Sequence, residues 1–324
     1  MPMHIVELRK HFLNQNNSKD YTAHLSKVHS VAWNCRGDKL ASGSLDKTAC
    51  VYALDKDKLI KELSLKGHAD TVDQLCWHPI NPYQLVTASG DKTVRLWDIK
   101  SSKSYANIPT KGENINVCWS PDGNTIAVGS KDDLVTFIDV KKQSIIAEEQ
   151  FKFEVNEISW NNENDLFFLT TGQGNISILN YPDLKIQQVI YAHPSNCICI
   201  KFDPTGRYFA IGSTDALISI WHSQELICLN VIARLEWPIR SVSFSYDGKI
   251  LASASEDLII DLANVPTGEK LGEVKCRAST FTIAWHPSKY ILAYACDDKD
   301  KSDKDAGTVK LYGVPNEIVD TLPN

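Results

Sequence analysis

The sequence predicts an all-β chain that folds as a single seven-bladed β-propeller. A short apolar run ends in an aromatic residue seven times, at intervals of 41 to 44 residues, and these aromatic anchors are Trp33, Trp77, Trp119, Trp160, Phe202, Phe244 and Trp285. Most anchors are followed by a turn rich in Gly, Pro, Asn and Asp, and then by a strand of small residues such as Leu40–Ser44. An acidic turn and another β-rich strand, such as Val94–Asp98, complete the repeat. Four short strands in every ~42 residues are typical of one propeller blade.

The ring is expected to close through the N-terminal part of the chain. The strands are near-continuous apolar runs, which indicates that both of their faces are buried, and an isolated blade could not bury both. Only ten residues follow the last recognisable strand, 309–314, so no segment remains there for the outermost strand of blade seven. We expect residues near Lys19 to Thr22 to supply this strand and to join the two ends of the chain.

The predicted domain organisation is simple. Residues 18–314 form the propeller, and residues 1–17 form an N-terminal extension. In this extension Ile5, Leu8 and Phe12 are spaced as on one side of a short helix, which could dock on a partner. Residues 297–306 form a highly charged insertion in blade seven, and residues 315–324 form a C-terminal tail.

Composition excludes several classes of protein. A net charge of −6 argues against a stand-alone nucleic-acid binder, which usually carries a basic stripe. No segment approaches the ~20 apolar residues of a membrane span. The nine cysteines are odd in number and scattered, which is typical of buried thiols in a reducing compartment. Cys197 and Cys199 are the one close pair, and no second pair nearby completes a zinc site.

Blade two carries a polar set with a recognisable spacing: Gly67-His68, then Thr87, Asp91 and Trp97-Asp98. On these residues and the anchors, about 300 of the 324 residues resemble the WD-repeat family. The resemblance implies that His68, Thr87, Asp91 and Trp97 form a buried hydrogen-bonded relay with a structural role, because unpaired polar groups are costly to bury. His24 and His193 stand nine residues before their anchors, as His68 does, whereas the other blades place Thr110, Phe151, Leu235 and Cys276 there.

The sequence offers no site for catalysis, for a cofactor or for a metal ion. It contains no phosphate-binding loop, no Gly-x-Ser-x-Gly and no His-Glu-x-x-His motif. Propeller enzymes tend to bring His, Asp or Glu from several blades to the central channel. The residues four before the anchors, near the channel mouth, are His29, Asp73, Ile115, Asn156, Ile198, Arg240 and Phe281. They make neither a metal site nor an acid–base pair, so we expect a protein that is not an enzyme.

The same positions predict a binding surface. In the WD-repeat family, the residues four and six before each anchor line the rim where peptides and partner loops dock. The resulting candidate partner-binding rim is Lys27, His29, Asp73, Glu113, Glu154, Asn156, Arg240 and Phe281. Asp73, Glu113 and Glu154 form an acidic arc over blades two to four. One hypothesis is that the arc receives a basic segment of a partner, and the alternative is that these are ordinary solvated rim charges.

Several runs, some of them irregular, are more specific than the generic repeat: 27–33, 72–79, 110–123, 148–162, 192–204, 295–300 and 307–311. They resemble the THO complex subunit 3 family, the small WD-repeat subunits of a nuclear assembly that couples transcription to messenger-RNA export. The resemblance implies a nuclear, non-catalytic scaffold whose partners are the other THO subunits. A DEAD-box RNA helicase and export adaptors would be reached through the complex, and RNA mainly indirectly.

Two other functions are consistent with a propeller. A substrate receptor of a cullin ubiquitin ligase usually carries Trp-Asp-x-Arg at the end of a blade, but this chain has Trp97-Asp98-Ile99-Lys100. A reader of peptides or histone tails needs an aromatic or acidic pocket at the channel mouth. Phe281 and Asp73 are candidates for that pocket, although the repeat places them about three blades apart.

Overall fold

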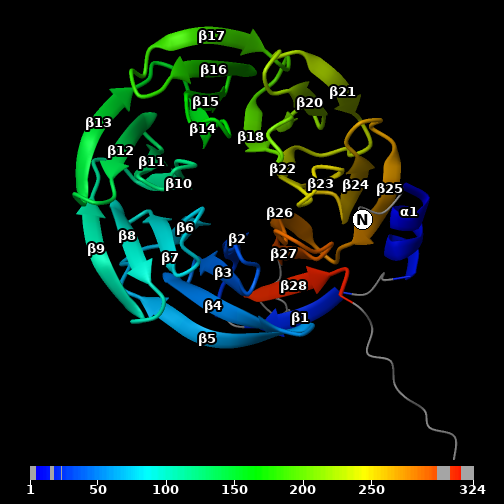
Figure 1. The fold of residues 1–324 in the computed structure, drawn as a ribbon, viewed down its shortest axis with the longest axis horizontal. Helices are drawn as coiled ribbons and strands as arrows, with labels where there is room; N and C mark the ends of the chain where they lie inside the picture. Colours follow the sequence, from blue (N-terminus) through cyan, green and yellow to red (C-terminus); the bar gives the residue numbers. More distant parts are fainter. Residues whose placement is uncertain (1–4, 15–17, 23, 298–306, 315–324) are drawn as a thin grey trace, which may run out of the picture.

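Seven four-stranded antiparallel sheets stand around a central channel in the computed structural model (Figure 1). The structure describes residues 5–14, 18–22, 24–297 and 307–314. In blades one to six the strands follow one another in chain order from the channel to the perimeter. The predicted seven-bladed propeller is therefore confirmed. Each aromatic anchor is the last residue of the innermost strand of its blade.

The first three blades span residues 28–150. From the channel outward, blade one consists of β2 (Val28–Trp33), β3 (Lys39–Ser44), β4 (Thr48–Asp55) and β5 (Lys58–Lys66). Blade two consists of β6 (Val72–Trp77), β7 (Gln84–Ser89), β8 (Thr93–Asp98) and β9 (Lys103–Pro109). Blade three consists of β10 (Asn114–Trp119), β11 (Thr125–Ser130), β12 (Leu134–Asp139) and β13 (Ser144–Gln150). Turns with positive φ join many of these strands, for example at Gly37 (φ 74°), where a side chain would clash with the His286 ring.

Blades four to six span residues 155–275. Blade four consists of β14 (Val155–Trp160), β15 (Leu166–Thr171), β16 (Asn175–Asn180) and β17 (Ile186–Tyr191). Blade five consists of β18 (Cys197–Phe202), β19 (Tyr208–Ser213), β20 (Ile218–His222) and β21 (Cys228–Ile232). Blade six consists of β22 (Ile239–Phe244), β23 (Ile250–Ser255), β24 (Ile259–Asn264) and β25 (Lys270–Lys275). The two middle strands of each blade contain mostly buried residues, because adjacent blades cover both of their faces.

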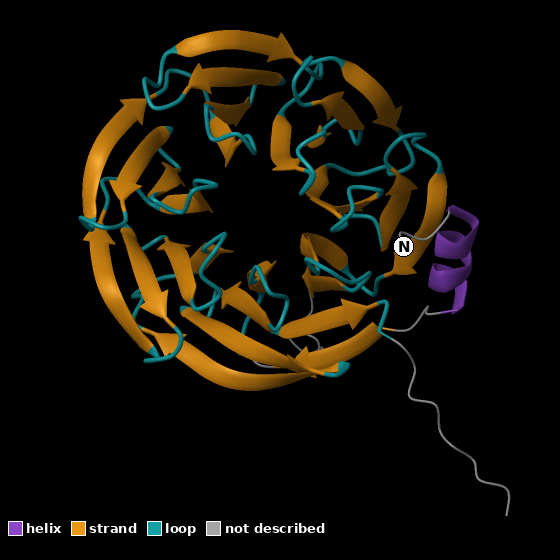
Figure 2. Ribbon diagram, viewed as in Figure 1, coloured by secondary structure: helices purple, strands orange, loops and turns teal. Residues whose placement is uncertain are grey.

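Blade seven joins the two ends of the chain, as predicted. Its inner strands are β26 (Ser279–Trp285), β27 (Leu292–Asp297) and β28 (Thr308–Tyr312), and its outermost strand is β1 (Ser18–Thr22). Ser18 pairs with Tyr312 and Thr22 with Thr308 in an antiparallel register. The ring is thus held shut by a ladder between residues almost 300 positions apart, as Figure 2 shows at the lower right of the ring.

The hydrophobic core lies between blades and not within them. One cluster, for example, joins Val86, Val94 and Leu96 of blade two to Val117 and Trp119 of blade three. Six of the seven anchors are nearly inaccessible to solvent, and Phe202 is partly buried. Each anchor therefore fills the wedge between its own blade and a neighbour.

The N-terminal extension contains a helix, α1 (Ile5–Asn14), which lies outside β25 on the perimeter (Figure 2). Leu8 and Phe12 are buried in a cluster with Leu271, Tyr290 and Tyr312. The apolar side of this helix therefore packs on its own chain, and Leu8 and Phe12 are not available to dock on a partner. Among the described residues, no helix has the length and apolar character to cross a bilayer. The charged insertion after Asp297 and the tail 315–324 lie outside the described residues.

Candidate interaction site at the channel mouth

The innermost strands all carry a β-bulge at the same place, and the bulge forms the channel mouth. In each of these strands the pairing register shifts across one residue, the fourth before the anchor. A bulged residue leaves the ladder and its side chain is re-aimed. The seven residues released in this way are His29, Asp73, Ile115, Asn156, Ile198, Arg240 and Phe281. They line a cavity of about 520 Å³ along the ring axis.

Cations surround an aromatic ring on one side of the mouth. Lys27 Nζ lies 3.9 Å from the centroid of the Phe281 ring, and Arg240 Cζ lies 5.5 Å from it. Lys27 is held by Asp297 at 2.8 Å, and Arg240 by Glu256 at 2.5 Å. The structure therefore brings together three of the predicted rim residues from blades one, six and seven. The carboxylates Asp297 and Glu256, which fix the cations, were not among the predicted residues.

The opposite side of the mouth is acidic, but its carboxylates differ in environment. Thr71 donates a 2.7 Å hydrogen bond to Asp73, yet burial raises the pKa of the Asp73 carboxyl. Glu113 is paired with Lys131 at 2.6 Å, whereas Glu154 is exposed. Within the predicted arc, Asp73 is thus partly buried and Glu113 is ion-paired, which leaves Glu154 as the solvent-exposed carboxylate.

The other two polar residues of the predicted rim, His29 and Asn156, differ in their hydrogen bonding. Burial lowers the pKa of His29, next to the Asp73 charge, and its Nε2 is buried without a hydrogen-bond partner among the described residues. Asn156 donates to Asn196 Oδ1 at 2.7 Å and to the Cys197 carbonyl at 3.0 Å, both in blade five. Asn156 therefore ties adjacent blades together at the mouth, while His29 retains an unused polar atom.

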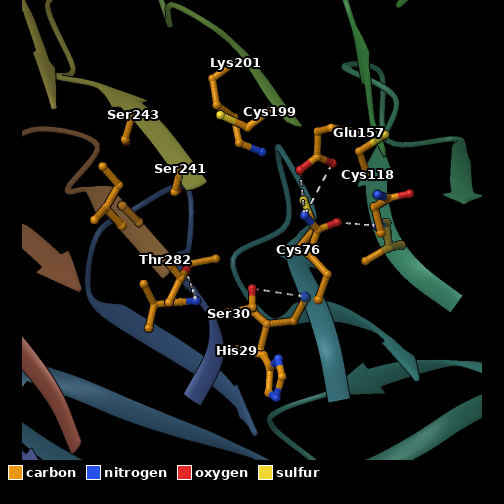
Figure 3. A pocket seen from close by; sticks show the side chains of 18 of the residues that line it. His29, Ser30, Cys76, Cys118, Glu157, Cys199, Lys201, Ser241, Ser243 and Thr282 are labelled. Carbon is orange, nitrogen blue, oxygen red and sulfur yellow. Dashed lines mark hydrogen bonds between the residues drawn. The ribbon is translucent and has the colours of Figure 1, made fainter. Parts of the chain in front are cut away.

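Below the mouth lies a polar layer that the sequence analysis did not single out (Figure 3). Gln74 donates to the Glu157 carboxylate at 3.1 Å, from blade two to blade four, and accepts the Val117 N–H at 2.5 Å. Ser30 and Thr282 accept backbone N–H groups of the following blades in the same way. These side chains stand three residues before the anchors, so the repeat contained the signal that would have identified them.

The lining of the channel is also charged and rich in thiols. Lys201 and Cys199 come from β18, and Cys76 and Cys118 from β6 and β10 (Figure 3). Burial raises the pKa of all three thiols, and that of Cys199 to about 12. Burial alone would lower the pKa of Lys201, but the Glu157 charge together with the neighbouring Cys76, Cys118 and Cys199 side chains raises it. No group of His, Cys, Asp and Glu side chains suited to a metal ion occurs in the described part of the chain.

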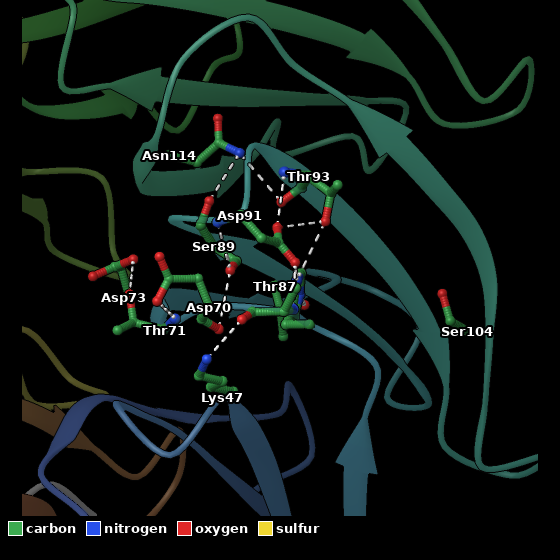
Figure 4. A network of polar contacts seen from close by, with 12 residues as sticks. Lys47, Asp70, Thr71, Asp73, Thr87, Ser89, Asp91, Thr93, Ser104 and Asn114 are labelled. Carbon is green, nitrogen blue, oxygen red and sulfur yellow. Dashed lines mark hydrogen bonds and ion pairs between the residues drawn. The ribbon is translucent and has the colours of Figure 1, made fainter.

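The blade-two relay has short hydrogen bonds throughout. His68 Nδ1 lies 2.9 Å from Asp91, His68 Nε2 lies 2.7 Å from Thr87 Oγ1, and Trp97 Nε1 donates to the same hydroxyl at 2.9 Å. Burial lowers the pKa of His68. Burial acts to raise the pKa of Asp91, but hydrogen bonds from Thr93, Ala69 and His68 prevail and lower it to about 2 (Figure 4). These hydrogen bonds tie the turn at Asp91 to the strands of blade two.

Blades one and five contain variants of the relay. His24 bonds Asp46 at 3.0 Å and Ser42 at 2.7 Å, and Tyr52 replaces the tryptophan. In blade five, His193 bonds Asp215 at 3.0 Å and Ser219 at 2.8 Å. Trp221 donates to that same Ser219 hydroxyl at 2.7 Å.

Blade six replaces the relay with a buried ion pair. Arg234 donates to both carboxylate oxygens of Asp261, at 2.9 and 2.6 Å, and to the Gly268 carbonyl at 2.8 Å. The Asp261 side chain is completely buried. Ser253, which corresponds to Thr87, has no hydrogen-bond partner for its hydroxyl among the described residues. In blade six a charge pair therefore joins the segment before β22 to β24 in place of the relay.

The closed ring with its His–Asp and His–Ser/Thr relays is the architecture of a WD-repeat β-propeller. A solved β-propeller domain of Cps50 (Swd1) from Myceliophteria thermophila superposes with a TM-score of 0.80. The superposition covers 92% of this chain and 100% of that domain. At 17% sequence identity, this similarity shows the fold alone.

Residues 24–295 match the family described as THOC3 beta-propeller domain. "THO complex subunit 3" of Arabidopsis thaliana is 48% identical over 92% of this chain and 95% of its own length. "Protein TEX1" of Saccharomyces cerevisiae is 26% identical over 76% of this chain and 63% of its own length. The chain belongs to the THO complex subunit 3 family.

Proposed function

We propose that this chain is a non-catalytic scaffold subunit of a nuclear THO complex, in which it helps couple transcription to messenger-RNA processing and export. The observation that carries the proposal is the 48% identity to "THO complex subunit 3" over nearly the whole of both chains. The matched region covers 92% of this chain and 95% of that relative. The partners are then the other THO subunits. The helicase and export adaptors are reached through them, and RNA is contacted mainly indirectly.

The geometry supports a role in binding and gives no support to catalysis. The polar residues of the relay are hydrogen-bonded to one another, which supports a structural role for them. At the channel mouth, in contrast, the Phe281 ring with its two fixed cations lines the same cavity as Asp73. A surface of mixed sign with an aromatic centre is suited to a peptide segment of a partner. We therefore propose the rim residues as contacts with another subunit.

Affinity purification of the full chain from nuclear extract tests this function. We expect the large THO subunits in near-equal amounts with the tagged chain, measured by quantitative mass spectrometry. Recovery of cullin adaptors alone, or of nucleosomes alone, would overturn the proposal in favour of a ligase receptor or a histone-tail reader.

A further inference from the structure

In blade seven other residues replace the buried relay of blade two, and a cavity lies among them. Cys276 holds the position of His68, nine residues before the anchor. Tyr294 holds the position of Thr87, since each pairs with the residue two before the anchor of its blade. A cysteine side chain is smaller than a histidine, so it fills less of the wedge between two blades. Cys276 and Tyr294 line a cavity of about 240 Å³ between blades six and seven, which stand side by side in Figure 1.

Two exposed cations line this cavity from blade six. Lys275 is the last residue of β25, and Arg277 follows it on the other side of Cys276. The residues that flank the relay histidine of blade two are Gly67 and Ala69, which carry no charge. In blade seven the missing histidine is therefore accompanied by two positive charges at the same place.

A third cation of the cavity, Lys310 of β28, is buried. Its side chain is 6% exposed, and its Nζ lies 3.1 Å from Oδ2 of Asp20 on the closing strand β1. An ammonium group has three donors, so Lys310 can hold Asp20 and a second anion together. Of the described residues that line the cavity, three are cations and one is a carboxylate, so the lining has a net charge of +2.

The remaining polar groups of the cavity do not oppose an anion. The Tyr294 hydroxyl donates a 2.7 Å hydrogen bond to Ser18 Oγ, so the Ser18 hydroxyl keeps its own hydrogen for another acceptor. Burial raises the pKa of Tyr294. A hydrogen bond with Cys296, together with burial, raises the pKa of the Cys276 thiol. Both groups are therefore uncharged at neutral pH and add no negative charge to the site.

We propose that this cavity binds the phosphate group of a phosphorylated serine or threonine in a peptide of a partner protein. Such a group carries a charge of about −1.5 to −2 at neutral pH and has three strong acceptor oxygens. Its charge offsets that of the cavity, and its oxygens match the donors of Lys275, Arg277 and Lys310. A phosphate in the backbone of RNA carries a single negative charge and has a nucleoside on either side, so this small cavity fits it less well. The site goes beyond the proposed function and does not depend on it.

Retention of the purified full chain on peptide beads tests this site without any THO subunit. One set of beads carries a degenerate peptide library with a fixed phosphoserine, and the other carries the same library with serine. We expect about tenfold more protein on the phosphoserine beads, because only they offer a dianion to the cavity. Equal retention on the two sets would overturn the inference. Elution by inorganic phosphate or by single-stranded RNA, at the concentration of the bead-bound phosphoserine, would also overturn it, since the ligand would then be a free ion or a nucleic acid.

Three variants assign the binding to the cavity. K275A/R277A is expected to lower retention on the phosphoserine beads about tenfold or more, because it removes two charge-assisted contacts. The control K141A/K142A removes the same charge from an exposed turn between β12 and β13, and retention should be unchanged. D20N removes the carboxylate that opposes an anion and should raise retention about threefold, which a merely structural role would not do. Melting temperatures equal to that of the parent show that the variants fold, and unchanged retention in K275A/R277A or in D20N would then contradict the inference.

Discussion

The indole N–H of Trp77 donates a 2.9 Å hydrogen bond to the backbone carbonyl of Ala32 on the preceding blade. Trp119 bonds Cys76 of blade two in the same way at 3.1 Å, and Trp33 bonds Ala284 of blade seven at 3.2 Å. An anchor therefore both fills the wedge between two blades and fastens their innermost strands. This double role explains why a tryptophan, and not merely an apolar residue, stands at several anchor positions.

Replacing Trp77 with Phe should cost about 1–2 kcal/mol of the free energy of unfolding, because it removes the hydrogen bond to the Ala32 carbonyl. Replacing Trp77 with Ala should cost about 3–5 kcal/mol, since a cavity is added. Urea denaturation measures both. Trp160→Phe is the matched control, because the Trp160 indole N–H is buried without a partner among the described residues. A cost for Trp160→Phe equal to that for Trp77→Phe would contradict this account.

The ion pair of blade six should be strongly coupled. Arg234→Met is expected to cost about 3–5 kcal/mol, because it leaves the completely buried Asp261 charge uncompensated. The double variant Arg234→Met/Asp261→Leu removes both charges and should recover most of that loss. A double-mutant cycle in urea measures the coupling energy. Additive effects of the two substitutions would show that the pair is not coupled.

His286 should make stability depend on pH. Its Nε2 is 2.9 Å from the Gly37 carbonyl, and its Nδ1 accepts the Ser288 and Lys289 N–H groups at 3.1 Å, so the folded protein holds the neutral ring. Burial lowers its pKa from 6.5 to about 4. A lowered histidine pKa means that the unfolded chain binds more protons than the folded protein between pH 4 and 6.5. The stability that the neutral His286 ring contributes is therefore fully present above pH 6.5. It is lost as the pH falls from 6.5 towards 4, by about 3 kcal/mol in total.

Urea denaturation between pH 7.5 and 4.5 checks this dependence. His286→Asn should be less stable than the parent at pH 7.5, and its stability should fall less steeply below pH 6.5. Parallel curves for the two proteins would rule out His286 as the source. His24, His29, His68 and His78 also have lowered pKa values and set the slope that remains.

The acidic arc can be tested by one exposed carboxylate. If a basic segment of a partner binds there, Glu154→Lys should lower the recovery of that partner about fivefold or more, because like charges then meet at the rim. Recovery is measured by pull-down with quantitative mass spectrometry. Glu225→Lys makes the same charge change at an exposed turn between β20 and β21 and should have no effect. Unchanged recovery with Glu154→Lys would leave the arc as ordinary solvated charge.

The sequence by itself determined the number of blades, the closure by residues near Lys19 and the positions at the channel mouth. The blade number and the mouth positions are local and repeated, because each blade must bury both faces of its strands against its neighbours and so keeps one spacing of anchor, turn and strand. The closure followed from the strand that blade seven lacks after residue 314. The resemblance to the WD-repeat family identified His68, Thr87 and Asp91, which lie within one blade and are joined by short hydrogen bonds.

Only the tertiary structure decided which side chains meet across blades. Gln74 bonds Glu157 across 83 positions, and Lys27 and Arg240 reach Phe281 from two different blades. Arg234 meets Asp261 where the repeat pattern is broken, and Leu8 and Phe12 pack on blade six instead of remaining free. A spacing pattern specifies which face a residue occupies in its own strand. The distance between side chains on different blades depends on the curvature of the ring, which arises only when all seven blades have packed together.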